Sequence, residues 1–204
     1  MRYEDPEHFF EILSKALAKR IAEEIGLANF ISERLQFEGW LKVVLVSELV
    51  NFLGRPVFVE HEIDSKERID VVIPGLYALE LKVITTNYVA QCVSTKNKDI
   101  TNQIQNLISD LRKLSDLKEQ SSKEQPIILG LSFPIPSTSY SKCSYSKWQR
   151  HVARVLLESK RYFPHIRYRD YRVNLPCSNR NSVPGVIFTF YDYDDDSNKQ
   201  RNSY

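Results

Sequence analysis

The pattern of apolar and polar residues between positions 57 and 83 predicts three short strands in succession. Their expected ranges are Val57–Ile63, Arg68–Ile73 and Tyr77–Val83, and turn-prone residues separate them. The second and third strands are joined through Pro74-Gly75, a connection so short that the two strands are expected to be antiparallel neighbours. The rest of the chain is predicted to be arranged around this segment.

Helical periodicity, with apolar residues every three or four positions, predicts four helices elsewhere. We expect them from Asp5 to about Gly26, from Ser32 to Leu53, from Asp99 to about Lys118, and from Ser146 to about Tyr162. Asp5, Asp99 and Ser146 are the expected N-caps, since their side chains can accept from amides of the first helical turn. Further strands are predicted at Ile127–Phe133, Tyr168–Leu175 and Val186–Tyr191.

This succession of elements predicts an α/β protein with a central mixed sheet of four to five strands flanked by helices, and with an extra N-terminal helix. A chain of 204 residues can bury one substantial core but is short for two. We therefore expect one domain over residues 1–191. Residues 192–204 are polar, and their composition predicts a disordered tail.

Ionisable residues interrupt two of the otherwise apolar strands. Side chains alternate along a strand, so Glu80 and Lys82 share one face of Tyr77–Val83 while Leu81 faces the core. Asp70 lies within the preceding strand, where an antiparallel pairing can bring it beside Glu80. Two carboxylates and an ammonium beside a core cost free energy unless something compensates them, and a hard divalent cation would do so.

These residues resemble the motif of the PD-(D/E)xK superfamily, the restriction-endonuclease-like nucleases: an Asp at a strand end and Glu-x-Lys on the next strand. The matching residues are Asp70, Glu80 and Lys82, and Ile69 stands where the family name has Pro. The order of helices and strands also fits the family core over about Ser32–Phe133. A charged outer strand face is the alternative explanation for a lone Glu-x-Lys triplet.

The resemblance implies a metal-dependent endonuclease, a hydrolase that cleaves DNA and leaves a 5′-phosphate. Asp70, Glu80 and the Leu81 carbonyl would hold Mg²⁺ or Mn²⁺. Lys82 would orient or deprotonate the attacking water and stabilise the charge that grows on the phosphate. Whether such an enzyme would serve restriction, repair or recombination is left open.

Members of the superfamily often supply a further acid from the helix before the three strands. Glu38 fits this role best and would complete the metal shell, with Glu48 as the second choice; a first-turn acid favoured by the helix dipole is the alternative for Glu38. In part of the superfamily a Gln or Lys near the next helix also reaches the site, which makes Gln103 and Lys98 auxiliary candidates.

Basic residues are concentrated in the C-terminal part of the chain. The net charge is only +2, yet residues 142–180 hold ten Lys and Arg against two acids, so this segment is about +8. Such an excess is typical of a polyanion partner, although solvated charge explains many basic runs. The candidate phosphate contacts for DNA are Lys142, Lys147, Arg150, Arg154 and Arg161.

Other features of the sequence restrict the classes of protein to which the chain could belong. Cys92, Cys143 and Cys177 have the spacing of neither a disulfide framework nor a zinc site, and we expect reduced thiols. The histidines are scattered, and no glycine-rich phosphate loop is present. No signal-peptide pattern and no membrane-length apolar run occur, so an intracellular, cytoplasmic protein without a membrane partner is expected.

Two alternatives to an active nuclease stay open. One is a catalytically idle protein with the same fold that binds nucleic acid or serves as an accessory subunit. The other is a protein-interaction domain in which the long N-terminal helix makes the main contact. In either case that helix could cover the sheet or form a homodimer interface.

Overall fold

The structure is a computed structural model that describes residues 5–35, 37–62, 68–88, 90, 92–94, 99–119, 123–135, 145–177 and 181–193. These residues form an α/β protein with five helices and a six-stranded mixed sheet. The helices are α1 (Pro6–Glu23), α2 (Leu27–Ser32), α3 (Glu38–Leu53), α4 (Ile100–Glu119) and α5 (Tyr145–Ser159). The strands are β1 (Phe58–Glu62), β2 (Arg68–Ile73), β3 (Tyr77–Thr85), β4 (Gln125–Phe133), β5 (Ile166–Pro176) and β6 (Ser182–Asp192).

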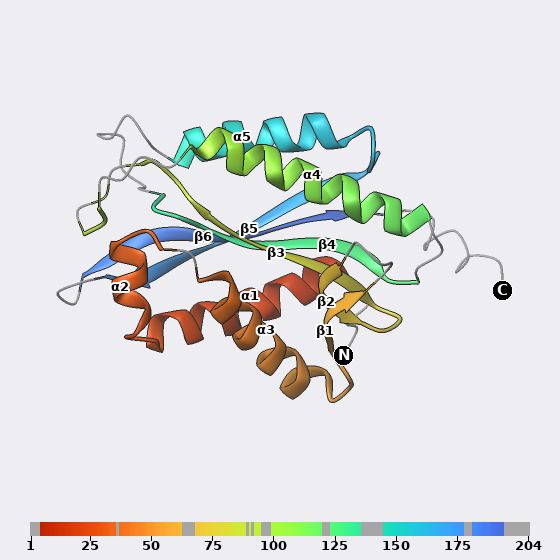
Figure 1. The fold of residues 1–204 in the computed structure, drawn as a ribbon, viewed down its shortest axis with the longest axis horizontal. Coiled ribbons are helices and arrows are strands. Elements are labelled where there is room, and N and C mark those ends of the chain that lie inside the picture. The colour runs from red at the N-terminus through yellow and green to blue at the C-terminus, as the bar shows by residue number, and fades with distance from the viewer. Residues whose placement is uncertain are drawn as a thin grey trace.

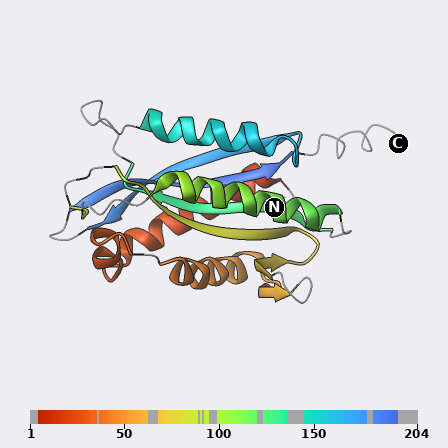
Figure 2. The same cartoon turned by 45° about the horizontal axis from the view of Figure 1, so that its top comes forward.

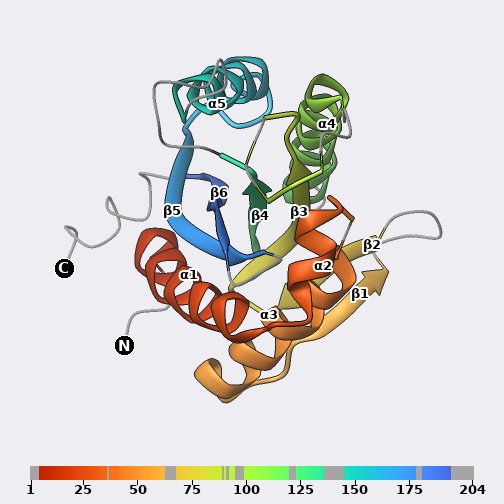
Figure 3. The ribbon, with the colours of Figure 1, turned by 90° about the vertical axis from the view of Figure 1, so that its left-hand side faces the viewer.

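The sheet is the middle layer of three. Its strand order is β1-β2-β3-β4-β6-β5, and β3 and β4 are the parallel pair in an otherwise antiparallel arrangement. Helices α1, α2 and α3 cover one face, and α4 and α5 cover the other (Figures 1 and 2). Helix α4 makes the crossover between β3 and β4, as a parallel pair requires. The end-on view in Figure 3 shows the same three layers.

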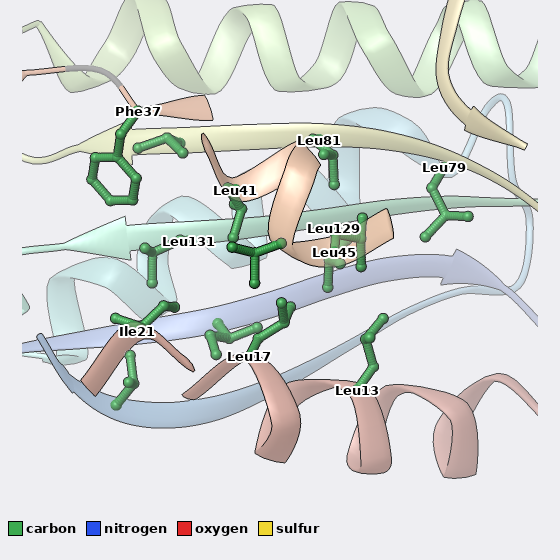
Figure 4. Close-up of a cluster of buried hydrophobic side chains, with 14 of the residues drawn as sticks. Leu13, Leu17, Ile21, Phe37, Leu41, Leu45, Leu79, Leu81, Leu129 and Leu131 are labelled. Atoms are coloured by element: carbon green, nitrogen blue, oxygen red, sulfur yellow. The ribbon is translucent and has the colours of Figure 1, made fainter. Parts of the chain in front are cut away.

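Each sheet face buries its own apolar core. On the α1–α3 side, alternate residues of β3 and β4 pack against the helices (Figure 4). The residues labelled there are Leu13, Leu17, Ile21, Phe37, Leu41, Leu45, Leu79, Leu81, Leu129 and Leu131. The α4–α5 side packs around the fully buried Trp148, with Ile104 and Phe188. Strands β3 and β4 are thus covered on both faces, which explains their nearly continuous apolar sequences.

Several predicted elements agree with the structure. Asp5 caps α1 by accepting from the Glu7 amide at 3.0 Å, and Asp99 accepts from the Thr101 amide at 2.8 Å at the start of α4. The predicted antiparallel β2–β3 hairpin is confirmed. The sheet, however, has six strands rather than four to five, because both C-terminal strands pair with each other and β6 pairs with β4.

Two helix boundaries differ from the prediction. The helix expected over Ser32–Leu53 is divided into α2 and α3, with Arg34 in the left-handed region at φ 53° between them. Its buried guanidinium donates to the Thr86 and Tyr88 carbonyls, a tertiary contact that local periodicity does not reveal. Helix α5 begins at Tyr145, so Ser146 lies inside the helix and not at its N-cap.

The cysteine and tail predictions also need correction. Cys92 and Cys177 form a disulfide, although their sequence separation of 85 gave no sign of a pairing. Asp192, expected to open a disordered tail, ends β6 and is buried, with an ion pair of 2.8 Å to Lys118. Cys143 and the remainder of the predicted tail, 194–204, lie outside the described residues. Within the described part of the chain, no helix has the length and apolarity to cross a membrane.

Candidate functional site

The candidate site lies where β2 and β3 separate. The two strands pair from Val71 opposite Leu79 to Ile73 opposite Tyr77. Beyond these paired residues, two carboxylates replace the neighbouring strand and accept hydrogen bonds from backbone amides of β3. Asp70 Oδ2 accepts from the Leu81 amide at 2.8 Å, and Glu38 Oε2 accepts from the Val83 amide at 3.1 Å.

This geometry sets the direction of the Leu81 carbonyl. The N–H and C=O of one strand residue point to the same side of the strand, so the Leu81 carbonyl faces the opening that holds the Asp70 carboxylate. Strand β3 is buried on both faces, which fixes its backbone at this point. The opening therefore combines carboxylate oxygens with a backbone carbonyl, all on regular structure.

Asp70 and Glu80 form a hydrogen-bonded pair of carboxyl groups, and Glu80 is only 5% exposed. Burial and the hydrogen bond with Asp70 raise the pKa of Glu80 to about 8. For Asp70, burial acts in the same direction, but hydrogen bonds from Glu80, Lys42 and the Leu81 amide outweigh it, so its pKa lies below the ordinary value. The pKa values of the two carboxyl groups therefore shift in opposite directions.

Three lysines neutralise this region. Lys42 Nζ lies 2.7 Å from Asp70 Oδ1, and Lys113 Nζ is hydrogen-bonded to Glu80. Lys82 Nζ forms an ion pair of 2.9 Å with Asp110 Oδ2 of α4. Two helices on opposite faces of the sheet, α3 and α4, therefore contribute charges to one corner of the molecule.

Burial and the same neighbouring charges also shift the pKa values of Lys82 and Glu38. Burial lowers the pKa of Lys82, but Asp110, Glu38 and Glu80 outweigh this effect and raise it above its ordinary value. Lys82 is therefore an ammonium at neutral pH. Burial raises the pKa of Glu38 despite the nearby Lys82 and the Val83 amide.

The auxiliary candidates are not part of this cluster. Glu48 points to α1 and pairs with Arg20 at 3.3 Å. Gln103 accepts from the Thr85 amide and donates to the Thr85 carbonyl, which fixes the end of β3. Lys98 lies outside the described residues. Neither Glu48 nor Gln103 contacts the Asp70–Glu80 pair in the described structure.

Sequence reasoning missed four charged residues of the corner: Lys42, Glu60, Asp110 and Lys113. A weak signal existed for Lys42, since it follows Glu38 by four positions and thus shares its helix face. Lys113 and Asp110 are likewise three apart on α4. A charge on a helix is usually solvated, and only the packing against β2 and β3 distinguishes these residues.

The predicted DNA-binding residues lie at the far side of the sheet. Helix α5 packs against β5, whereas the carboxylates are on β2 and β3. Arg150 is exposed, but Arg154 pairs with Glu158 at 2.6 Å, and Arg161 lies over the Tyr162 ring at 4.5 Å. Lys147 is partly buried and Lys142 lies outside the described residues. The structure does not gather this set around the candidate site.

The donor set restricts what metal the corner could hold. Among the described residues, no group of three His, Cys, Asp or Glu side chains has the arrangement of a metal site. Asp70, Glu80 and the Leu81 carbonyl remain as oxygen donors, which suits Mg²⁺, an ion that often takes one or two carboxylates and keeps several waters. The fit requires that the metal displace Lys113 from Glu80.

Comparison with known proteins yields no relative. No protein-family model, no curated protein and no solved structure matches this chain. The functional argument therefore depends on the geometry of the chain itself.

Proposed function

We propose that this protein is a metal-dependent endonuclease that hydrolyses DNA phosphodiester bonds, built on a restriction-endonuclease-like core. One observation carries the proposal: the Asp70 carboxylate lies beside Glu80 where the pairing of β2 and β3 ends, and it accepts from the amide of Leu81, the residue between Glu80 and Lys82. The succession of an antiparallel meander, a helix and a parallel strand supports the same core.

In this proposal Asp70, Glu80 and the Leu81 carbonyl would hold Mg²⁺ or Mn²⁺. The metal, when bound, would supply a Lewis acid and an activated water. Glu38 bonds to the Val83 amide and would act on metal-bound water rather than as a direct ligand. Strands β2 and β3 position Asp70, Glu80 and Leu81, and helix α3 positions Glu38, as precise orientation of a reacting phosphate requires.

Lys82 would orient the attacking water and stabilise negative charge on the phosphate oxygens. Its pKa is raised by Asp110, against the effect of burial, so it carries a proton at neutral pH and is a poor general base. This favours charge stabilisation over proton abstraction. Asp110 would hold the Lys82 ammonium in place through the 2.9 Å ion pair.

The test is incubation with supercoiled plasmid, linear, single-stranded and branched DNA in Mg²⁺ or Mn²⁺. We expect nicking or cleavage that Asp70→Asn and Lys82→Ala each reduce by roughly 10²–10³-fold, the usual effect of removing one electrostatic catalytic group. Asp116→Asn and Lys15→Ala, at exposed positions of α4 and α1, are the matched controls. Equal cleavage by all five proteins would refute the assignment.

A second function has a specific observation in its favour. Lys42 and Lys113 already neutralise Asp70 and Glu80, so the corner is electrically satisfied without a metal. A catalytically idle DNA-binding or accessory protein would keep this arrangement. Metal-independent DNA binding, together with no cleavage of any of the four substrates, would favour it.

A further inference from the structure

Three acidic residues lie side by side across β1, β2 and β3. Val59 pairs with Val71 and His61 with Ile69, which sets Glu60 opposite Asp70. The next step of the β2–β3 register sets Asp70 opposite Glu80, and these two carboxyl groups are hydrogen-bonded. Asp70 is thus the central carboxylate of a row that crosses three strands.

Glu60, the first residue of this row, has an unusual backbone conformation. Its φ is 49°, in the left-handed region that residues with a side chain rarely occupy. Such conformations cost free energy and concentrate at functional sites. Here the strained residue directs its carboxylate toward α3, where it meets Lys42.

The Lys42 ammonium bridges two members of the row. Its Nζ lies 2.7 Å from Asp70 Oδ1 and 3.1 Å from Glu60 Oε1, and the side chain is 16% exposed. These two carboxylates outweigh the effect of burial and raise the pKa of Lys42, so the group is a cation at neutral pH. The positive charge of Lys42 therefore lies next to Asp70, on the side away from Glu80.

Enzymes that hydrolyse phosphodiesters often place two divalent ions about 3.5–4 Å apart, one on each side of a shared carboxylate. Asp70 has the position of that shared carboxylate. On one side it meets Glu80 and the Leu81 backbone, where the proposed metal would bind; on the other it meets the Lys42 ammonium.

We propose that the Lys42 ammonium takes the place of a second metal ion, so that the site operates with one divalent ion and one lysine cation. An ammonium is a compact point charge with three donors. Glu60 and Asp70 use two of them, and the third is directed to an oxygen of the phosphate group. This inference deepens the proposed nuclease function and rests on it.

The proposal predicts a change in metal stoichiometry. Lys42→Met keeps the aliphatic stem but removes the charge, which leaves Glu60 and Asp70 as a carboxylate pair without the cation that bridges them. Manganese binding to the DNA-free protein, counted by electron paramagnetic resonance of free Mn²⁺, should rise from one ion in the natural protein to two in Lys42→Met. Lys15→Met, which removes an exposed lysine of α1 that pairs with Glu11, should still bind one.

A double variant isolates the second position. Adding Glu60→Gln to Lys42→Met should return the count to one, because the new position then keeps a single carboxylate. Lys42→Arg, which retains a cation, should also bind one. In cleavage assays the dependence of rate on Mg²⁺ should change from first order in the natural protein toward second order in Lys42→Met.

The outcomes separate the inference from the function on which it rests. One ion in both the natural protein and Lys42→Met, with both proteins folded by thermal melting, would refute the role of Lys42 while leaving the nuclease proposal intact. No bound ion in either protein would refute the metal site itself, and the inference would fall with it.

Discussion

The two edges of the sheet hold their partly or fully buried carboxylates in opposite ways. At the β5 edge, Asp170 Oδ2 accepts hydrogen bonds from the hydroxyls of Tyr145 and Tyr168, and from the Gln149 amide at 3.3 Å. Trp148 completes this network by donating to the Tyr168 hydroxyl at 2.8 Å. In the corner formed by β1, β2 and β3, by contrast, the carboxyl groups of Asp70 and Glu80 lie against each other, and burial together with Asp70 raises the pKa of Glu80.

Glu7 repeats the β5-edge arrangement on the other sheet face. Its Oε1 accepts from Arg169 at 2.6 Å, Tyr191 at 2.8 Å and Arg167 at 3.3 Å. These donors outweigh burial and lower the pKa of Glu7. A cavity of about 420 Å³ adjoins Glu7 and Arg169.

The difference indicates which cluster is structural. A carboxylate surrounded by neutral and cationic donors stabilises the fold, because each donor is satisfied in turn. Asp70 and Glu80 instead lie against each other, and their pKa values shift in opposite directions, as they do in acid–base and metal sites. Mutation should therefore have opposite effects on stability at the two edges.

The largest predicted contrast is in folding stability. Asp170→Ala leaves two tyrosine hydroxyls without their shared acceptor, and we expect a loss of about 1–3 kcal/mol. Glu80→Gln replaces a buried acid that is costly to ionise beside Asp70 with a neutral amide of similar size, and stability should be unchanged or higher. Urea unfolding of both variants measures the contrast, with Asp116→Ala as the exposed control. Equal destabilisation by Asp170→Ala and Glu80→Gln would make both clusters structural.

The second contrast concerns pH. The folded-state pKa of Glu80 is about 8, against an ordinary value of 4.5. The folded chain thus keeps a proton that the unfolded chain loses, so this contribution to stability is full below pH 4.5 and is lost as the pH rises to about 8. The lowered pKa of Asp70 acts below its ordinary value of 3.8, outside this window.

Glu80→Gln should lack that loss. Between pH 5 and pH 8 the natural protein should lose on the order of 3 kcal/mol relative to the variant, or roughly 6–12 °C in melting temperature. Thermal melts of metal-free protein across this range measure the effect. Parallel melting curves for the two proteins would mean that Glu80 is already ionised at pH 5.

The sequence revealed the β2–β3 hairpin because strand alternation and the Pro74-Gly75 turn are local signals. The same alternation placed Asp70 beside Glu80. The division between α2 and α3 escaped prediction, since it depends on the buried Arg34 contact with the chain after β3.

The cations of the corner escaped prediction for a similar reason. Lys42 and Lys113 look like ordinary helix-surface residues in the sequence, and their role depends on how α3 and α4 pack against the sheet. The Cys92–Cys177 disulfide joins two segments far apart in the chain, and no spacing rule identifies such a pair. Contacts set by tertiary packing thus account for most of what sequence reasoning missed.

The smallest predicted effect tests whether the two edges cooperate in DNA binding. Arg150 on α5 is exposed, whereas Arg154 is engaged by Glu158 at 2.6 Å. If α5 holds the phosphate backbone, Arg150→Gln should reduce the slope of log affinity against log salt by about 0.9, the value for one phosphate contact. Arg154→Gln should change the slope less, because its guanidinium is already paired.

Fluorescence anisotropy of a labelled duplex in metal-free buffer at several salt concentrations measures both slopes. Unaltered slopes in both variants would indicate that DNA binds away from α5, at the edge that carries Asp70 and the exposed Arg68. The two edges would then have independent roles.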